Sequence, residues 1–327
     1  MKQIHKLAIV GTVITLAAVL ASGGVPVQAK PQTIATLPPG AISNVQAQVL
    51  AKVIQQNSDL QMRVIPFRGN SAEMEAVDSK QVGFSVMDAT DATVAVSGIN
   101  EFGGRPLKNL RVAFTIMPFA VGFMVKKDSD IKTVAQIRGR KFPTGWTSFK
   151  SGQVLSNGIL ATAGLSLKDV DPVPASNLIQ AADDFKAGRT VGTMFAVGAP
   201  KVAEVNAALG GIRFLSIDHS PEAVARMKKV RSEYFPITLK PRPNLPGIIG
   251  PTNLLGFNLV LLAGMHVSDD IVYEVVKAIY PNKAELAKGH PSFNAFSQDR
   301  MAVKYGTLRY HPGAIKFFKE VGLWKDN

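Results

Sequence analysis

Residues 141–163 read KFPTGWTSFKSGQVLSNGILATA, and this stretch predicts a strand, a loop and a helix in succession. The strand ends at Gly145, the loop presents Trp146, Thr147 and Ser148, and apolar residues then recur at the spacing of one helical face. A hydroxyl of Thr147 or Ser148 would cap the helix by accepting a hydrogen bond from a free amide of its first turn. Those amides and the helix dipole favour an anion at this end. An ordinary loop in an α/β core explains the same residues, so the stretch alone leaves both interpretations open.

The same succession recurs along the chain, which predicts an α/β fold. Before the opening stretch we expect strands at 32–37, 62–67 and 82–87 and helices at 43–56 and 71–78. Asn70 and Glu73 would form a capping box for the second of these helices. Asp88 directly follows a strand, at the end where sheets of this class bind ligands. It would either take a ligand amine or cap the next helix.

Two junctions divide the chain into two lobes. Apolar strands at 110–117 and 121–126 are separated only by Pro118-Phe119-Ala120, which suits a strand that leaves one lobe and enters the other. Five prolines between 236 and 251 exclude a long helix or a central strand, so we place the second crossing at 236–249. The predicted organisation is lobe I at 30–118 plus 250–327 and lobe II at 119–235, with a ligand cleft between them.

The first 29 residues are predicted to be a cleaved signal peptide. Lys2 and Lys6 precede an apolar run at 7–21, and Val27-Gln28-Ala29 provides small residues at the cleavage site. The run is short for a membrane span, which needs about 20 apolar residues. We therefore expect an exported, periplasmic protein whose mature form begins near Lys30. The chain has no cysteine, so its stability would not depend on disulfides.

Charge and motifs exclude several classes of function. The formal net charge is +13, but the basic residues are scattered and lack interleaved aromatics, which argues against nucleic acid as a partner. This charge is either a solvated surface or a field that attracts anionic small molecules. The five histidines lack metal-ligand spacing, and no nucleotide-binding or hydrolase motif occurs. Ser129–Lys132 fits S-x-x-K without its partner motifs. We expect no metal, no cofactor and no enzymatic activity.

The last part of the chain resembles a known family most specifically. Residues 269–280, His290-Pro291 and 310–320 are similar to the closing pattern of the TAXI family, the solute-binding proteins of one class of TRAP transporter. The segments 103–111 and 127–141 also fit. The resemblance implies a two-lobed, periplasmic-binding-protein-like clamp of type II, with a mainly parallel sheet flanked by helices in each lobe. It also implies a monomer that closes on a ligand and delivers it to the membrane subunits of a sodium-driven TRAP transporter.

The resemblance further implies four ligand-binding loops. Carried over residue by residue, they contain Gly40 and Ser43; Arg68, Gly69, Asn70 and Ser71; Gly145, Trp146, Thr147 and Ser148; and Val197 and Gly198. The first loop departs from the family pattern, since its paired glycines and tyrosine are missing. Asp88 joins the candidate site from its position after a strand.

Two of these residues suggest the kind of ligand. The guanidinium of Arg68 matches a carboxylate in a bidentate fork, so we expect a small organic anion, either a carboxylate or an amino acid. Trp146 would form a wall of the pocket or belong to a lobe core. A sensor module or an exported enzyme on a similar scaffold is the alternative function.

Overall fold

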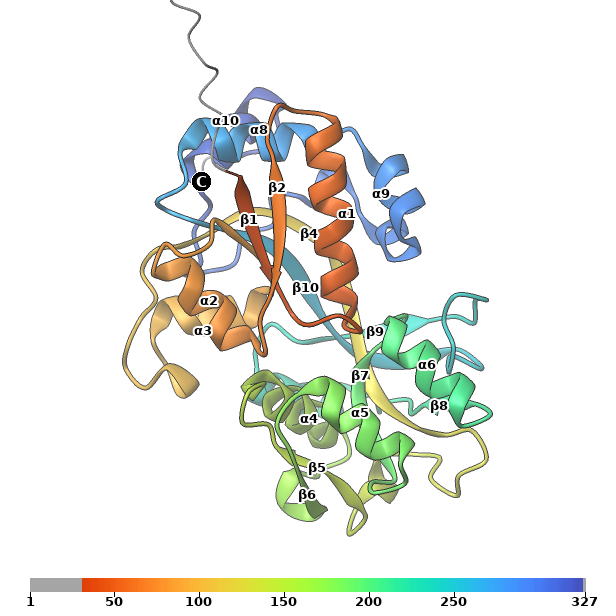
Figure 1. The fold of residues 1–327 in the computed structure, drawn as a ribbon. Coiled ribbons are helices and arrows are strands. Elements are labelled where there is room, and N and C mark those ends of the chain that lie inside the picture. The colour runs from red at the N-terminus through yellow and green to blue at the C-terminus, as the bar shows by residue number, and fades with distance from the viewer. Residues whose placement is uncertain (1–30, 326–327) are drawn as a thin grey trace, which may run out of the picture. The chain divides into compact units, whose positions relative to one another are not determined.

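Two long strands, β4 (Leu110–Lys126) and β10 (Thr252–Gly264), lie side by side and organise the fold (Figure 1). The structure is a computed structural model that describes residues 31–325, so the predicted signal peptide at 1–29 lies outside the described residues. The two strands pair antiparallel from Leu110 opposite Gly264 to Val121 opposite Leu255. Each strand then continues beyond this ladder and pairs with different strands at its two ends.

One lobe surrounds the first half of β4 and the second half of β10. Its strands are β1 (Gln32–Thr36), β2 (Met62–Pro66) and β3 (Phe84–Asp88). The first of these pairs in parallel with the other two, and β3 pairs antiparallel with β10. Its helices are α1 (Ile42–Gln56), α2 (Asn70–Asp78), α3 (Ala89–Ser97), α8 (Asp269–Ile279), α9 (Lys283–Gly289) and α10 (Pro312–Glu320) (Figure 1).

The other lobe surrounds the opposite ends of the two long strands. β7 (Gly192–Ala196) and β8 (Ile212–Phe214) pair with β4, β9 (Phe235–Leu239) pairs with β10, and β5 (Lys141–Gly145) pairs in parallel with β6 (Asp171–Ala175). Its helices are α4 (Lys150–Thr162), α5 (Leu178–Lys186), α6 (Pro200–Ala208) and α7 (Pro221–Val230). Short 3-10 turns occur at Asn100–Phe102, Val134–Ile137, Leu167–Asp169, Pro291–Ala295 and Gln298–Arg300.

This architecture confirms the predicted two-lobed α/β fold and corrects its strand pattern. The main sheet is mixed: β1 pairs in parallel with β2 and β3, whereas β10 pairs antiparallel with β3 and β4. The two strands expected at 110–117 and 121–126 form one strand that continues through Pro118. The second passage between the lobes is β10, whereas Pro236 lies in the edge strand β9.

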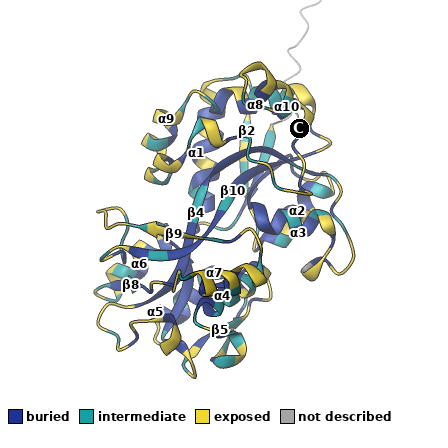
Figure 2. Cartoon of the chain, turned by 180° about the vertical axis from the view of Figure 1, so that it is seen from behind, coloured by how far each residue is buried: buried dark blue, intermediate teal, exposed yellow. Residues whose placement is uncertain are grey.

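The core follows the two long strands. Seen from behind, they are almost wholly buried beneath helices that are exposed on their outer faces (Figure 2). Phe123 of β4 packs on Phe142 of β5 with ring centroids 4.6 Å apart, which ties the small sheet to the large one. Within residues 31–325 no helix combines the length and the apolar character needed to cross a membrane.

Some helix N-termini have the expected side-chain cap and others do not. Asp88, for which capping was one of two expected roles, accepts a hydrogen bond from the amide of Thr90 in the first turn of α3. Ser220 and Ser268 cap α7 and α8 in the same way. The predicted capping box of α2 is wrong, because the helix already begins at Asn70 and its N-cap residue, Gly69, has no side chain to cap with. The predicted cap of α4 is also wrong, since its N-cap residue is Phe149 rather than Thr147 or Ser148.

Candidate ligand cavity between the lobes

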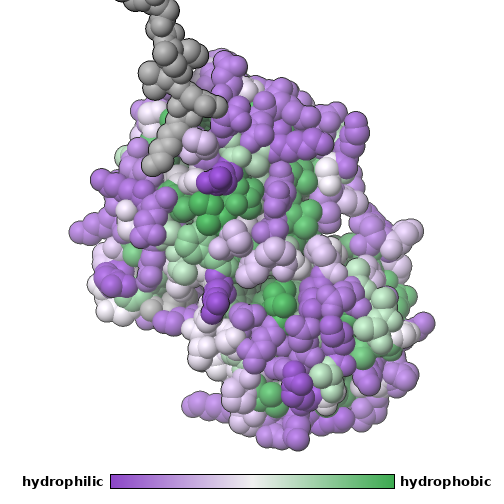
Figure 3. All heavy atoms as spheres, viewed as in Figure 1, coloured by the Kyte–Doolittle hydropathy of each residue, from purple (hydrophilic) through white to green (hydrophobic). Residues whose placement is uncertain are grey.

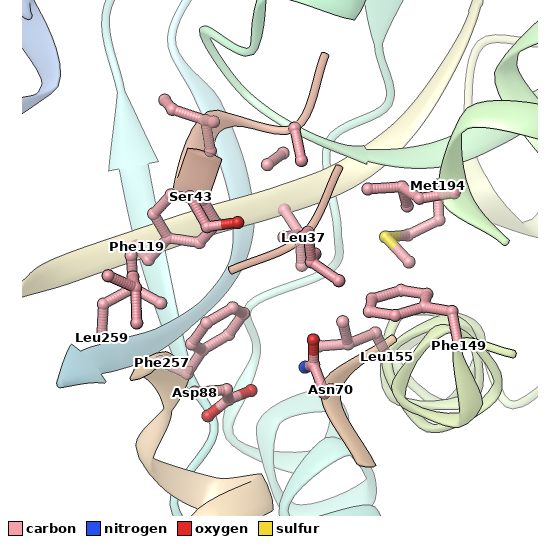
Figure 4. A pocket seen from close by; sticks show the side chains of 16 residues that line it. Leu37, Ser43, Asn70, Asp88, Phe119, Phe149, Leu155, Met194, Phe257 and Leu259 are labelled. Carbon is pink, nitrogen blue, oxygen red and sulfur yellow. The ribbon is translucent and has the colours of Figure 1, made fainter. Parts of the chain in front are cut away.

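An apolar cavity of about 60 Å³ lies where the two lobes meet. Figure 4 shows Ser43, Phe119 and Leu259 on one side of it and Phe149, Leu155 and Met194 on the other. Its wall consists of Leu37, Ala41, Ile42, Ser43, Asn70, Val86, Asp88, Phe119, Val121, Phe149, Leu155, Leu178, Met194, Ala196, Phe257 and Leu259. At roughly 10–15 Å³ for each water, this volume holds a handful of waters or a small organic molecule.

The two long strands form the aromatic floor of the cavity. Phe119 of β4 and Phe257 of β10 are register partners, and their ring centroids are 5.4 Å apart in a tilted arrangement. Val121 and Leu259 extend this floor along the same strands. Because β4 and β10 run through both lobes, this floor belongs to both of them.

Three polar residues line the cavity, and all three come from the ends of elements in one lobe. Ser43 lies in the first turn of α1, a helix end without a side-chain cap. Asn70 begins α2, and its Nδ2 donates to Asp91 Oδ2 at 2.9 Å and to Ser151 Oγ at 3.1 Å. Asp88 ends β3, and its Oδ1 accepts from the amide of Thr90 at 2.7 Å. Each lies at the end of a strand or in the first turn of the helix that follows one, where α/β folds bind ligands.

Two of these polar groups keep free hydrogen-bonding capacity. Among the described residues, neither Ser43 Oγ nor Asp88 Oδ2 has a hydrogen-bond partner. Ser43 is 8% exposed and Asp88 is 4% exposed, so bulk water does not replace the missing partners. Buried polar groups are normally satisfied, which makes these two atoms candidates for contact with a ligand.

Buried acids give the region around the cavity an unusual electrostatic character. Burial, with a smaller contribution from the charge of Asp91, raises the pKa of Asp88 well above its ordinary value of 3.8, although hydrogen bonding to Thr90 and, to a lesser degree, the charge of Arg231 act in the opposite direction. Burial also raises the pKa of Glu73 well above 4.5, while a hydrogen bond from Ser85 opposes that shift. Burial therefore makes both carboxyl groups harder to ionise than an exposed acid.

Arg68 does not line this cavity. It is exposed and borders an outer hollow with Pro38, Pro39 and, from the other lobe, Arg189. No lysine or arginine occurs among the cavity-lining residues. Hydrophilic residues are instead spread over most of the surface seen in Figure 3, apart from an apolar band over β1 and β2. The predicted guanidinium contact is therefore absent from the cavity wall in this conformation.

The opening stretch contributes a different aromatic residue from the one expected. Trp146 is fully buried in the lobe core with φ at 45°, and its ring packs edge-on against Phe149 at 6.1 Å. Phe149, one turn further along, lines the cavity. Gly145, Thr147 and Ser148 are exposed and lie outside its wall. Trp146 thus has the core position rather than the wall position.

The remaining predicted loop residues mostly form contacts between the lobes. A Cβ added to Gly69 would lie 1.6 Å from the carbonyl oxygen of Ser148, so these two backbones touch. The carbonyl of Gly40 accepts a hydrogen bond from the amide of Lys201 at 3.2 Å. These contacts hold the lobes together around the cavity.

Three further predicted residues lie near the cavity without lining it. Ser71 is partly exposed on α2. Val197 is buried, and its amide donates to the carbonyl of Ala120. Gly198 follows with φ at 79°, and the preceding Ala196 lines the cavity in their place. Of the thirteen predicted residues, Ser43, Asn70 and Asp88 belong to the wall.

Sequence reasoning missed the apolar part of the wall. Phe119 was available, because it stands in the predicted junction between the lobes and a junction strand must border the cleft. Phe257 could not be found in this way, since the second passage was placed before it. In the described part of the chain no cluster of three or more His, Cys, Asp or Glu side chains could hold a metal ion.

Solved structures with the same fold are distant in sequence. PhnD1 of Prochlorococcus marinus, in complex with methylphosphonate, has a TM-score of 0.55 at 11% identity, covering 90% of this chain and 99% of that one. A structure described as a periplasmic transporter has a TM-score of 0.54 at 13% identity, covering 90% and 93%. A binding-protein component of an ABC phosphonate transporter from Pseudomonas aeruginosa has a TM-score of 0.52 at 12% identity, covering 82% and 80%. These similarities establish the two-lobed periplasmic-binding-protein fold.

Sequence similarity to a family covers nearly all of the described chain. The model described as the NMT1-like family matches residues 34–322, from the first strand to the end of the last helix. The chain belongs to the NMT1-like family.

Proposed function

We propose that this protein is the solute-binding component of a transporter and captures a small solute in the cavity between its lobes. The observation that carries the proposal is the construction of the cavity from both lobes over a floor of the two strands that join them. A solute that contacts both walls stabilises the closed arrangement over an open one, and closure is then the signal to the membrane partner. The fold neighbours that are named as transporter components support this function.

The composition of the wall favours binding over catalysis. Its polar members are Ser43, Asn70 and Asp88, and no histidine or lysine stands among the residues that line the cavity. A hydrolytic mechanism would need a base beside a nucleophile. We therefore propose a protein that binds its solute without changing it.

The proposed location and the proposed type of transporter rest on the sequence. The predicted signal peptide favours a periplasmic location, and the resemblance to the TAXI family favours a sodium-driven TRAP transporter as partner. Fold neighbours named as ABC transporter components support an ATP-driven partner instead. We also propose that residues 30–118 with 250–327 and residues 119–235 are the two bodies that move. An organic anion, if it is the solute, would be held by the first-turn amides of α1, because no basic side chain lines the cavity.

Closure can be measured directly, because the chain has no native cysteine. Lys52 on α1 and Lys168 in the other lobe are exposed, so a Lys52→Cys, Lys168→Cys variant can carry a donor and an acceptor dye. Native mass spectrometry of freshly purified protein would first identify the co-purifying solute. Adding that solute to stripped protein should then raise energy transfer and the melting temperature.

Two results would speak against solute capture. One is the absence of any co-purifying small molecule together with no response to a broad screen of amino acids, carboxylates, amines and phosphonates. The other is conversion of the bound solute into a product. Uptake of the solute into cells distinguishes a TRAP transporter from an ABC transporter as the membrane partner, since the first requires a sodium gradient and the second requires ATP.

A further inference from the structure

The two oxygens of the Asp88 carboxyl group have different surroundings. Its Oδ1 caps α3 through the amide of Thr90 at 2.7 Å. Its Oδ2 has no hydrogen-bond partner among the described residues, although the side chain is buried and lines the cavity. Figure 4 shows the carboxyl group beside the ring of Phe257, at the edge of the cavity space. Capping explains one oxygen and leaves the other for a ligand.

The charges near Asp88 indicate what this ligand group must be. Asp91 is a second buried acid on the same helix, and Glu73 is a third on α2. Arg231 is the basic residue that acts on Asp88, and its effect is smaller than those of burial and Asp91. A buried carboxylate oxygen without a hydrogen-bond partner is costly, so a positively charged donor placed at Oδ2 would be favoured.

The rest of the wall indicates the ligand's body. Phe119 and Phe257 present rings from the floor, and Phe149, Leu155 and Met194 face them from the other lobe (Figure 4). Such a wall favours an aliphatic or aromatic group. Within residues 31–325 Ser43 Oγ has no hydrogen-bond partner, so it can bond to a further polar group.

We infer that the solute carries a protonated nitrogen, which donates a hydrogen bond to Asp88 Oδ2, next to a small apolar body held among the three phenylalanines. This inference rests on the proposed function and names the chemical class of its solute. It differs from the expectation based on Arg68, whose side chain lies in the outer hollow. A carboxylate on the same solute is compatible with it, provided that the amine occupies Asp88.

Three probes of matched shape test the inference. Isopentylamine carries only the amine, 4-methylpentanoate carries only the carboxylate, and L-leucine carries both on the same branched body. Their affinities for ligand-stripped protein would be measured by calorimetry at pH 7.5. We expect isopentylamine or L-leucine to bind and 4-methylpentanoate to bind at least about tenfold more weakly, because it offers no donor to Asp88.

The variant Asp88→Asn removes the charge and keeps the fold, because asparagine caps a helix as well as aspartate does. It should weaken binding of the amine probe about 100-fold, as loss of a buried charged partner does. Asp128→Asn, which neutralises an exposed carboxylate outside the cavity, is the matched control and should leave the affinity unchanged. Melting curves of both variants without probe verify that they fold.

Several outcomes would overturn the inference. They are tighter binding of 4-methylpentanoate than of either amine, amine binding that survives in Asp88→Asn, and no binding of any probe to the wild type. The first two leave solute capture standing, because the protein still binds a small molecule. If native mass spectrometry also finds no solute, the proposed function fails as well.

Discussion

At the scale of single residues, Gly69 is where the two lobes touch. Its backbone meets that of Ser148 so closely that any side chain would overlap the carbonyl oxygen. The glycine is therefore required by the lobe contact rather than by its own dihedral angles, which are extended. This contact gives a direct way to separate closure from the chemistry of the cavity.

We predict that Gly69→Ala weakens solute binding at least about tenfold, because the added methyl group blocks the closed arrangement. The dissociation constant for the co-purifying solute measures this effect. Gly250→Ala is the matched control, since a Cβ there meets no atom within 4 Å. Equal affinity in the two variants would show that the observed lobe contact is not the ligand-bound one.

Trp146 and Phe149 are close in sequence and have different tasks. Trp146→Phe should lower stability by about 1–3 kcal/mol, because the indole is fully buried, and should change solute affinity less than twofold. Phe149→Ala removes part of the cavity wall and should weaken binding about tenfold or more. Thermal unfolding and calorimetry on both variants measure the two effects. A large affinity change in Trp146→Phe with unchanged stability would indicate that Trp146 contacts the solute.

The sequence could predict polar wall residues better than apolar ones. Ser43, Asn70 and Asp88 follow strands, and the carboxyl ends of strands are recognisable positions in an α/β pattern. Phe119 and Phe257 look like any buried strand residue until the pairing of β4 with β10 is known. Arg68 has the right chemistry for an anion, but nothing in one sequence determines on which side of a loop a side chain lies.

At the scale of elements, three helices meet in a buried polar contact across the lobes. Asp91 of α3 accepts from Asn70 of α2 at 2.9 Å and from Ser151 of α4 at 2.5 Å, and Asn70 also donates to Ser151. α4 belongs to the other lobe, so this network exists only while the lobes are in contact. It stabilises the contact between the lobes and includes Asn70 of the cavity wall.

Ser151→Ala should therefore weaken solute binding by about 1–3 kcal/mol, since it leaves Asp91 and Asn70 without one partner each in the closed form. Ser156→Ala on the same helix is the matched control, because its buried hydroxyl has no hydrogen-bond partner among the described residues. The rate of solute dissociation should be measured, because the hydrogen bonds of Ser151 should slow the separation of the lobes. Identical rates in the two variants would exclude a role for this network in closure.

Helix limits were predicted well and two caps were not. α1 and α2 lie within one residue of the expected limits 43–56 and 71–78, because their apolar spacing depends only on local sequence. The failed cap at Asn70 has a tertiary cause: its amide group is used by Asp91 and Ser151, which come from distant parts of the chain. Local rules fail where a side chain serves the contact between lobes.

At the scale of the whole molecule, the chain passes between the lobes along the two strands β4 and β10. The first junction was predicted at Pro118-Phe119-Ala120, and β4 runs through these residues without a break. The second was predicted at 236–249; the first part of this segment lies in strand β9, which pairs with β10. Proline is excluded from a central strand because it lacks the backbone N–H. The strand that runs through both lobes, β10, begins directly after the prolines, at Thr252.

Buried acids make the stability of the whole molecule depend on pH in an unusual direction. The pKa of Glu73 is raised well above 4.5, chiefly by burial and further by Asp91, with the hydrogen bond from Ser85 opposing it. Between pH 4.5 and its folded-state pKa, Glu73 binds a proton in the folded chain and releases it in the unfolded chain. Its contribution to stability is thus full below pH 4.5 and is lost as pH rises.

Glu73→Gln keeps the shape and removes this titration. The difference in unfolding free energy, variant minus wild type, should rise with pH above 4.5 by up to about 1.4 kcal/mol per pH unit until the folded-state pKa is reached. Groups such as Asp169, whose pKa is lowered by hydrogen bonds from Ser166, act below that range and cancel in the difference. Urea unfolding of both proteins at pH 4.5, 6 and 7.5, without ligand, measures it. A difference that stays constant across the three values would mean that Glu73 is ionised in the folded protein and that its burial is compensated by a cation or by water.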